Sequence, residues 1–376
     1  MANENVINQS LELIASLSLG SSKASQLSEQ LANIDHWESF VAQLEINGLA
    51  PIFNQQLRAH DELSELVPKT VSLQVKALVV RHQRATDVRS KAITEILPEF
   101  AKHNIEVIAL KGLALAYCVY PEPRLRPMRD IDLLVPKHQA LTAQQALRDI
   151  GYQAEDHNVG AMYDHHHLPI ASKIIDDMTM SIEVHHNALS GDVASSMSYA
   201  DLTQPPIHFE IEGHSIGRFG HIDTLRHLCH HAFEPAKRIK LGALLDILTY
   251  AETFHEEIDW TDLRTNHPFV INALRCLHFV IPLPKQLCTQ LIASSELAPT
   301  QLGQGYLPLS HLAAQKRGLT KTLQTMFTAP QWWAHIFYSV APEKSLFWVN
   351  TWRHPLQVLQ WLTRRYWALM RGRSSD

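Results

Sequence analysis

The stretch Asp130-Ile131-Asp132-Leu133-Leu134-Val135 is an apolar run that begins with two carboxylates separated by one residue. Successive strand residues point to opposite faces, so Asp130 and Asp132 share one face while Ile131 and Leu133 share the other. Carboxylates about 6–7 Å apart on one strand face repel each other, and a hard divalent cation between them would relieve that repulsion. The stretch therefore predicts a strand that carries a metal site. A single Asp-x-Asp pair is more often the solvated start of a strand than a metal site. The surrounding sequence must therefore distinguish between the two.

The residues before this strand favour the metal site. A second apolar strand is predicted over 105–110, and it breaks at Lys111-Gly112 into a helix-like stretch, 113–119. The loop 121–129 that follows contains three prolines and three arginines. In such sites carboxylates hold Mg²⁺, while cationic side chains and turn amides hold phosphates. This order of elements predicts a site for a metal ion and a triphosphate.

Several of these residues together resemble a known family. They are Leu110-Lys111-Gly112, Tyr120, Arg126, the run from Asp130 to Val135, and Gly151-Tyr152. In them the chain resembles the bacterial "uncharacterised nucleotidyltransferase" family of the DNA polymerase beta-like nucleotidyltransferase superfamily. The resemblance extends from the N-terminal helices to about residue 260 and is specific between 105 and 190. Members of the superfamily usually carry Gly-Ser or Gly-Gly after the first strand, where this chain has Lys111-Gly112 and a longer gap before the aspartates.

The resemblance implies a third carboxylate on a later strand, and Glu183 is the best candidate. Apolar and polar residues alternate over 178–185, which places Glu183 and His185 on the polar face. The preceding run, 168–175, ends at Asp176-Asp177, a predicted hairpin turn that pairs the two strands antiparallel. The alternative is an exposed glutamate on an edge strand. The resemblance favours the active site, because the family shows a similar Ile-Glu-Val/Leu-His strand at this point.

The function implied by this resemblance is transfer of an NMP from an NTP to a hydroxyl acceptor, with release of pyrophosphate. Asp130 and Asp132 would bind one or two Mg²⁺ (or Mn²⁺) ions, and Glu183 would complete the second metal site or serve as base. The residues that would hold the NTP co-substrate are Lys111, Gly112, Arg126, Arg129, His185 and Lys240. For Lys240, which shares a predicted helix with Asp246, the alternative is a core helix with snorkelling ends. The acceptor stays open: a protein side chain, an RNA 3′ end, a sugar or another small molecule.

Two other classes of protein compete with this interpretation. One is a toxin-like or non-catalytic interaction protein that keeps the fold and binds through its helical flanks, although the retained carboxylates speak against it. The other is a metal-dependent phosphohydrolase, for which His60-Asp61 is the only His-Asp dipeptide. Zinc chemistry is disfavoured, because adjacent histidines do not preassemble a chelate. His227 and His231 are four residues apart on a predicted helix, but they lack the glutamate that a metalloprotease requires.

The bulk composition excludes several classes of protein. The 376 residues are 45% hydrophobic and 19% charged, which is typical of an ordered globular chain. A formal net charge of −5 argues against a general polyanion binder. The four cysteines lack metal-type spacing and are expected to be reduced thiols. Neither a signal peptide nor an apolar stretch long enough to span a bilayer is evident, so a cytoplasmic location is expected.

The predicted fold class is α+β: a nucleotidyltransferase core with a small mixed sheet, flanked by N- and C-terminal helical regions. The predicted divisions are an N-terminal helical region, 1–103; the core, 104–220; a helical region, 221–330; and a Trp/Arg-rich helical tail, 331–376. In the first of these, Asp35 is predicted to cap a helix. A long amphipathic helix is predicted over 73–100, and its Arg81, Arg84 and Arg89 are expected on a solvated face.

The C-terminal tail is unusual in composition. Six of the eight tryptophans follow residue 330, and 352–373 contains five arginines and no acidic residue. Helical spacing over this segment predicts a basic amphipathic helix. Such a helix can dock against the protein's own body or a partner protein, lie on an anionic membrane, or stack on RNA. Docking is the favoured interpretation, with membrane contact next and nucleic acid last.

Overall fold

The computed structural model describes residues 2–155, 165–189, 196–233, 240–278, 280–291, 327, 331–340 and 344–370. The chain divides into two compact units, residues 1–259 and 260–376. Two of the predicted boundaries, at 103 and at 220, fall inside the first unit, and the one at 330 falls inside the second. Parts of the two predicted C-terminal regions, residues 292–326 and 371–376, lie outside the described residues.

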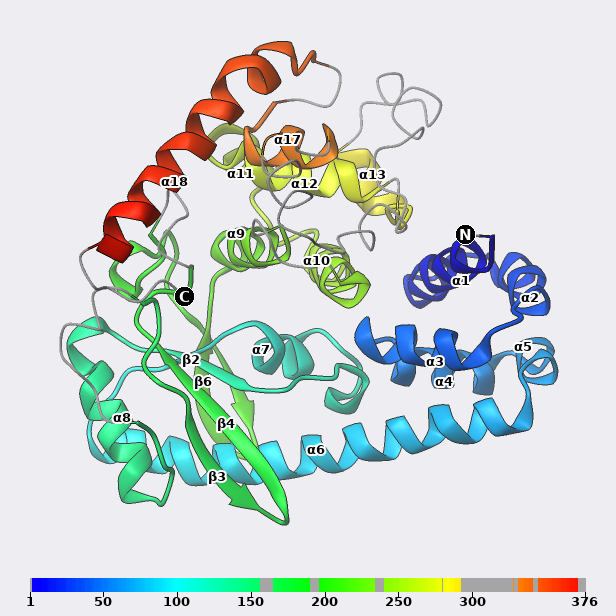
Figure 1. The fold of residues 1–376 in the computed structure, drawn as a ribbon. Coiled ribbons are helices and arrows are strands. Elements are labelled where there is room, and N and C mark those ends of the chain that lie inside the picture. The colour runs from blue at the N-terminus through cyan, green and yellow to red at the C-terminus, as the bar shows by residue number, and fades with distance from the viewer. Residues whose placement is uncertain are drawn as a thin grey trace. The chain divides into compact units, whose positions relative to one another are not determined.

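Helices open the first unit. They are α1 (Ala2–Ser18), α2 (Ala24–Ala32), α3 (Trp37–Ile46), α4 (Ala50–Ala59), α5 (Asp61–Leu66) and α6 (Lys69–Lys102). The N-cap of α3 is His36 and makes no side-chain cap bond, so the predicted Asp35 cap is wrong. The 34-residue α6 confirms the predicted long helix. Figure 1 shows it running from the N-terminal helices to the sheet, and it contacts both α4 and the strands.

The described residues contain one six-stranded sheet in the order β3-β4-β2-β1-β6-β5. Its strands are β1 (Ile108–Ala109), β2 (Ile131–Leu134), β3 (Ala171–Ile175), β4 (Met178–His185), β5 (Ile207–Ile211) and β6 (His214–Arg218). β1 pairs antiparallel with β2 and parallel with β6, while β2 pairs parallel with β4. The sheet is therefore mixed and flanked by helices, as the sequence predicts.

The β3–β4 pair is the antiparallel hairpin predicted from the sequence. Its turn residues Asp176 and Asp177 both have positive φ, 49° and 62°. This left-handed backbone matches the right-handed twist of the flanking strands, and aspartate tolerates it better than most residues. The hairpin fixes the register of β4, and β4 in turn places Glu183 beside β2.

Packed helices bury one face of the sheet. α6 and α8 (Ala140–Asp149) pack there on β3, β4, β5 and β6. The core between them is formed by apolar side chains of α6, α8 and the strands, among them Ile96, Phe100, Leu133, Leu147 and Ile182. On the opposite side a smaller core forms around Ile108, Leu110, Leu134 and Phe219. Because β2 alternates between these two cores, Asp132 lies on the side of the smaller one, between Ile131 and Leu133.

Three further helices complete the first unit: α7 (Lys111–Cys118), α9 (His221–Ala232) and α10 (Leu241–Thr253). The N-terminus of α10 is capped from a distant part of the chain. The side-chain Oδ1 of Asn47 accepts from the Leu241 N–H at 2.9 Å, and its carbonyl oxygen accepts from the Gly242 N–H at 3.0 Å. Gly242 permits this approach, because a Cβ there would lie 2.4 Å from the Asn47 carbonyl oxygen.

The second unit is helical where it is described. Its elements are α11 (Trp260–Asn266), α12 (Pro268–Leu277), α13 (Lys285–Leu291), α17 (Gln331–Phe337), a π-helical turn η5 (Val349–Arg353) and α18 (His354–Met370). α18 confirms the helix predicted in the tail. None of the described helices has the length and apolar character needed to cross a bilayer.

Candidate functional site

Two carboxylates and an imidazole meet at the centre of the sheet. Asp132 on β2 and Glu183 on β4 are direct neighbours in the parallel register, so both side chains project from the same face. His185 follows Glu183 by two residues and therefore shares that face. One ligand atom from each of the three lies within 4.8 Å of the others, and this is the only such group among the described residues.

His185 links the two carboxylates. Its Nε2 lies 3.0 Å from Asp132 Oδ1 and 3.2 Å from Glu183 Oε2. Burial lowers the pKa of His185, but hydrogen bonds to the two carboxylates outweigh it and raise the pKa above the usual 6.5. His185 is completely buried, and its Nδ1 has no hydrogen-bond partner in the described structure. The two carboxylates therefore favour the charged form of the imidazole relative to a free histidine.

Lys111 approaches the same carboxylate from the start of α7. Its Nζ lies 3.3 Å from Asp132 Oδ2, and the Leu110 N–H donates to the Asp132 carbonyl oxygen at 3.0 Å. Lys111 has a positive φ of 41°, which turns the chain sharply from β1 into the helix. Burial alone would raise the pKa of Asp132, but Lys111 and His185 hold it well below its ordinary value. Asp132 is thus an ionised carboxylate that is only 5% exposed.

Asp130 stands at the edge of this group. It is half-buried and directly precedes β2. Burial, followed by the negative charges of Asp132 and Glu183, raises the pKa of Asp130. The carboxylates of the site thus repel each other, as expected from the sequence for aspartates on one strand face. Such repulsion is what a bound divalent cation relieves.

Arg126 lies over α7 and is engaged by α10. Its Nη2 donates to Asp246 Oδ2 at 2.7 Å, its Nε to Asp246 Oδ1 at 3.3 Å, and the Tyr120 hydroxyl donates to the same Oδ1 at 2.7 Å. Gly112 makes room for the guanidinium, since a Cβ there would lie 2.3 Å from Arg126 Nη1. The structure therefore brings Arg126 together with Gly112 and Asp246. Its role in holding phosphate stays a prediction.

The other predicted nucleotide-binding residues are spread more widely. Arg129 is exposed, and Lys240 is exposed at the N-cap position of α10. Asp246 is buried in its ion pair with Arg126. Among the residues predicted for the nucleotide, the structure thus places Lys111 and His185 at the carboxylates. The roles of all of them in binding or catalysis remain predictions.

Arg89 was missed by the sequence analysis. It is 3% exposed, and its Nη1 donates to the Met128 carbonyl oxygen at 2.8 Å, two residues before Asp130. Burial, with a smaller effect of Arg126, lowers the pKa of Arg89 to about 10. The expected solvated face is therefore wrong for this arginine. Its position in register with the buried Ala85 and Ala92 of α6 was the available signal.

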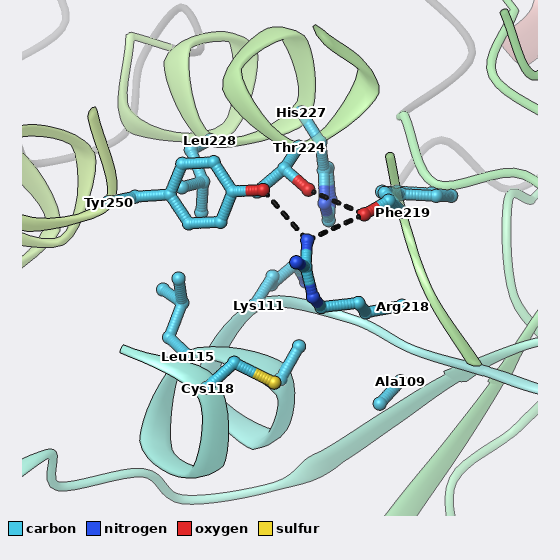
Figure 2. A pocket seen from close by; sticks show the side chains of 11 residues that line it. Ala109, Lys111, Leu115, Cys118, Arg218, Phe219, Thr224, His227, Leu228 and Tyr250 are labelled. Atoms are coloured by element: carbon cyan, nitrogen blue, oxygen red, sulfur yellow. Dashed lines mark hydrogen bonds between the residues drawn. The ribbon is translucent and has the colours of Figure 1, made fainter. Parts of the chain in front are cut away.

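A small pocket adjoins the carboxylates, and Lys111 belongs to both. The pocket is lined by residues of β1, β6, α7, α9 and α10, including Cys118, Arg218, His227 and Tyr250. Figure 2 shows Arg218 pointing toward Tyr250, and its Nη1 donates to the Tyr250 hydroxyl at 2.9 Å and to the Phe219 carbonyl oxygen at 3.1 Å. No carboxylate among the described residues pairs with Arg218. Nothing in the sequence pattern singled out this buried cation.

Two groups of neighbouring histidines are found, one around His185 and one on α9. The rings of His166 and His167 lie around His185, with centroids 5.4 Å and 5.2 Å from it. His227 and His231 are neighbours on α9 with centroids 6.4 Å apart. Burial, followed by the charge of Lys111, holds the pKa of His227 well below its usual value, so this ring is neutral. His60 of the His-Asp dipeptide pairs instead with Glu62 at the surface.

A family profile described as "Uncharacterised nucleotidyltransferase" matches residues 34–282. The match covers every strand of the sheet and the whole carboxylate–histidine cluster. No curated protein matches the sequence.

Three solved structures show weak similarity. The crystal structure of ANT(2")-Ia in complex with adenylyl-2"-tobramycin is 15% identical, covers 45% of this chain and 91% of its own, and has a TM-score of 0.31. A solution structure of the antibiotic-resistance factor ANT(2'')-Ia gives the same identity and TM-score and covers 85% of its own chain. An antigenic nucleotidyltransferase-like protein from Paracoccidioides brasiliensis is 14% identical, covers 50% and 93% of the two chains, and has a TM-score of 0.32. At these scores the likeness carries no argument about function.

Proposed function

The chain belongs to the uncharacterised nucleotidyltransferase family, and from this premise we propose that it transfers a nucleoside monophosphate from an NTP to a hydroxyl acceptor. The acceptor oxygen forms a bond to the α-phosphorus, the bond from that phosphorus to the bridging oxygen breaks, and pyrophosphate leaves. The proton of the hydroxyl passes to a carboxylate of the site. The observation that carries the proposal is the juxtaposition of Asp132, Glu183 and His185 at the centre of the sheet.

The donor set suits a divalent cation. Carboxylate oxygens are the ligands that Mg²⁺ prefers, and a nearby imidazole nitrogen is also compatible with Mn²⁺. We assign Asp132 and Glu183 as the residues that would hold the ion, with Asp130 completing the set. The pKa of Asp130 is raised by burial and then by the negative charges of Asp132 and Glu183, and this repulsion among the carboxylates supports the assignment. A cation bound here would stabilise negative charge on the phosphate oxygens.

Lys111, which contacts the Asp132 oxygen that His185 does not, supplies a positive charge for the phosphates. Lys111 is within 3.3 Å of Asp132 and also lines the neighbouring pocket, so it is placed to pair with a phosphate once a cation satisfies that carboxylate. Glu183, with a side chain 17% exposed, serves as a further ligand or as the base that accepts the hydroxyl proton. We leave the acceptor as a protein side chain, an RNA 3′ end or a small molecule.

The first experiment measures metal binding and transfer separately. We expect Mg²⁺ or Mn²⁺ to raise the melting temperature of the wild-type protein, and Asp132→Asn and Glu183→Gln to abolish that rise. Incubation with α-labelled NTPs and cell extract should release pyrophosphate and label an acceptor only when the carboxylates are intact. Glu210→Gln, an exposed carboxylate on β5, is the matched control. Undiminished transfer by folded Asp132→Asn protein would refute the proposal.

A further inference from the structure

The last described helical segment, residues 346–370, is anchored in the second unit by one of its faces. Leu346 and Val349 are buried in a small core with Ala334 and Tyr338. The Tyr338 hydroxyl also bonds to Nδ1 of the buried His354 at 2.8 Å. These contacts fix the rotation of the segment about its own axis, and therefore decide which side chains face outward.

The outward face carries large apolar side chains, which we name the aromatic stripe. Its members are Phe347 (64% exposed), Trp348 (72%), Trp352 (58%), Leu356 (54%), Leu359 (51%), Tyr366 (59%) and Trp367 (59%). Steps of three, four and seven residues separate most of them, which keeps them along one side of the helix. Among the described residues, Phe327, at 36%, is the one other exposed Phe, Tyr or Trp.

The exposure of the tryptophans in the aromatic stripe differs from what docking on the second unit itself would require. A tail docked on the rest of the second unit would bury its tryptophans there, whereas Trp348, Trp352 and Trp367 are more than half exposed. Contiguous exposed apolar surface of this kind marks an interaction site in most proteins. The buried residues His354 and Val358 mark the other side of the helix, which packs inside the protein.

The positive charge of the segment indicates which kind of partner the aromatic stripe binds. Residues 345–375 include five arginines and no aspartate or glutamate, although the whole chain has a formal charge of −5. A helix with Trp, Tyr and Leu on one side, in a segment whose sequence has basic but no acidic residues, suits the boundary between lipid headgroups and acyl chains.

We propose that the aromatic stripe binds the surface of an anionic phospholipid membrane, with the helical segment 346–370 lying in the plane of the headgroups. The aromatic rings enter the interface and the arginines pair with lipid phosphates. This inference is independent of the proposed transferase activity, because the residues that carry it belong to the second unit and the carboxylate cluster to the first. It selects one of the three partners that the sequence left open for the tail.

The test is sedimentation of the full chain with vesicles. We expect co-sedimentation with vesicles of 30% phosphatidylglycerol in phosphatidylcholine, and little with pure phosphatidylcholine. Raising the salt from 0.1 M to 0.5 M should weaken binding, because the arginine–phosphate attraction is screened. The tryptophan emission should shift to shorter wavelength on binding, since six of the eight tryptophans follow residue 330. Failure to bind anionic vesicles at low salt overturns the proposal.

Two variants distinguish binding by the aromatic stripe from non-specific adsorption through other exposed apolar side chains. Trp348→Ala/Trp352→Ala/Trp367→Ala should reduce the partition onto anionic vesicles by roughly tenfold or more, because each ring removes a large apolar area from water. Leu73→Ala/Val80→Ala, which removes exposed apolar side chains of α6, should leave the partition unchanged. Equal loss in both variants overturns the proposal. So does light scattering that shows a stripe-dependent dimer without vesicle binding, or retention on RNA that competes with vesicles equally well.

Discussion

At the scale of single residues, the site consists of buried side chains of opposite charge that lie in contact. Asp132 receives Lys111 on one oxygen and His185 on the other. Each cation is supplied by a different element, α7 and β4. The carboxylate is thus held ionised by two protein cations.

His185 makes the stability of the protein depend on pH. Its pKa is raised above 6.5 by the carboxylates, against the effect of burial, so its contribution is full below pH 6.5 and is lost as the pH rises through the folded-state pKa. Asp132, with a pKa depressed below 3.8, contributes above that pH and loses its contribution as the pH falls through its lower folded value. We therefore expect His185→Gln to lower the melting temperature most between pH 4 and 6.5.

The measurement is the difference in melting temperature between wild type and variant across pH 4 to 9, in the presence of a chelator. The difference should shrink toward alkaline pH. His208→Gln, an exposed histidine on β5, should show no such window. A difference that grows with rising pH would contradict the charge arrangement described for His185.

The sequence could identify those residues whose polar side chains recur at the spacing of a local strand or helix. The alternation of polar and apolar residues pointed to Asp132, and the same alternation together with the family resemblance pointed to Glu183; the register places the two side by side. Arg218 and Arg89 were not found, because their importance comes from elements far apart in the chain. A buried cation on a helix or at a strand end has no short-range signature.

At the scale of elements, α10 contacts two segments that are distant in sequence: the residues after α3 and the loop before Asp130. Asn47 caps its N-terminus, and Asp246 on its second turn forms an ion pair with Arg126. The sequence predicted the helix and singled out Asp246, but not its partner. Pairing across 120 positions of sequence depends on the tertiary fold.

We expect Asn47→Ala to destabilise the protein by about 0.5–2 kcal/mol, the usual effect of losing a helix cap. Asn47→Asp keeps the side-chain oxygen that accepts from Leu241 and should lose less. Denaturant unfolding of the two variants measures the difference. Equal stability of the alanine variant and the wild type would mean that water replaces the cap.

The Arg126–Asp246 pair should show the asymmetry of a buried ion pair. Asp246 is 4% exposed, so Arg126→Met leaves a buried carboxylate without its cation and should cost up to about 3–5 kcal/mol. Adding Asp246→Leu should recover most of that loss. Lys91→Met, in the exposed pair with Asp176, should cost less than about 1 kcal/mol. Equal costs for the Arg126 and Lys91 variants would contradict this account.

At the scale of the whole molecule, the sheet, both of its cores and the carboxylate cluster all lie within residues 1–259. We expect a chain that ends at Asp259 to fold with native-like circular dichroism and to keep the metal-induced rise in melting temperature. Calorimetry with and without Mn²⁺ measures this. A truncated chain that folds but no longer responds to metal, while the full chain does, would show that the site needs residues beyond 259.

The shortness of β1 has a consequence for how the chain acquires its fold. The β3–β4 and β5–β6 hairpins pair residues close in sequence, and each can zip up soon after its turn forms. β1 offers only Ile108 and Ala109, yet it alone joins the β2 side of the sheet to β6, through partners as distant as Gly217. Closing so long a loop for so few hydrogen bonds is entropically unfavourable and slow. The acidic centre on β2 and β4 and the buried arginine at the end of β6 should therefore come together late, in the rate-limiting step of folding.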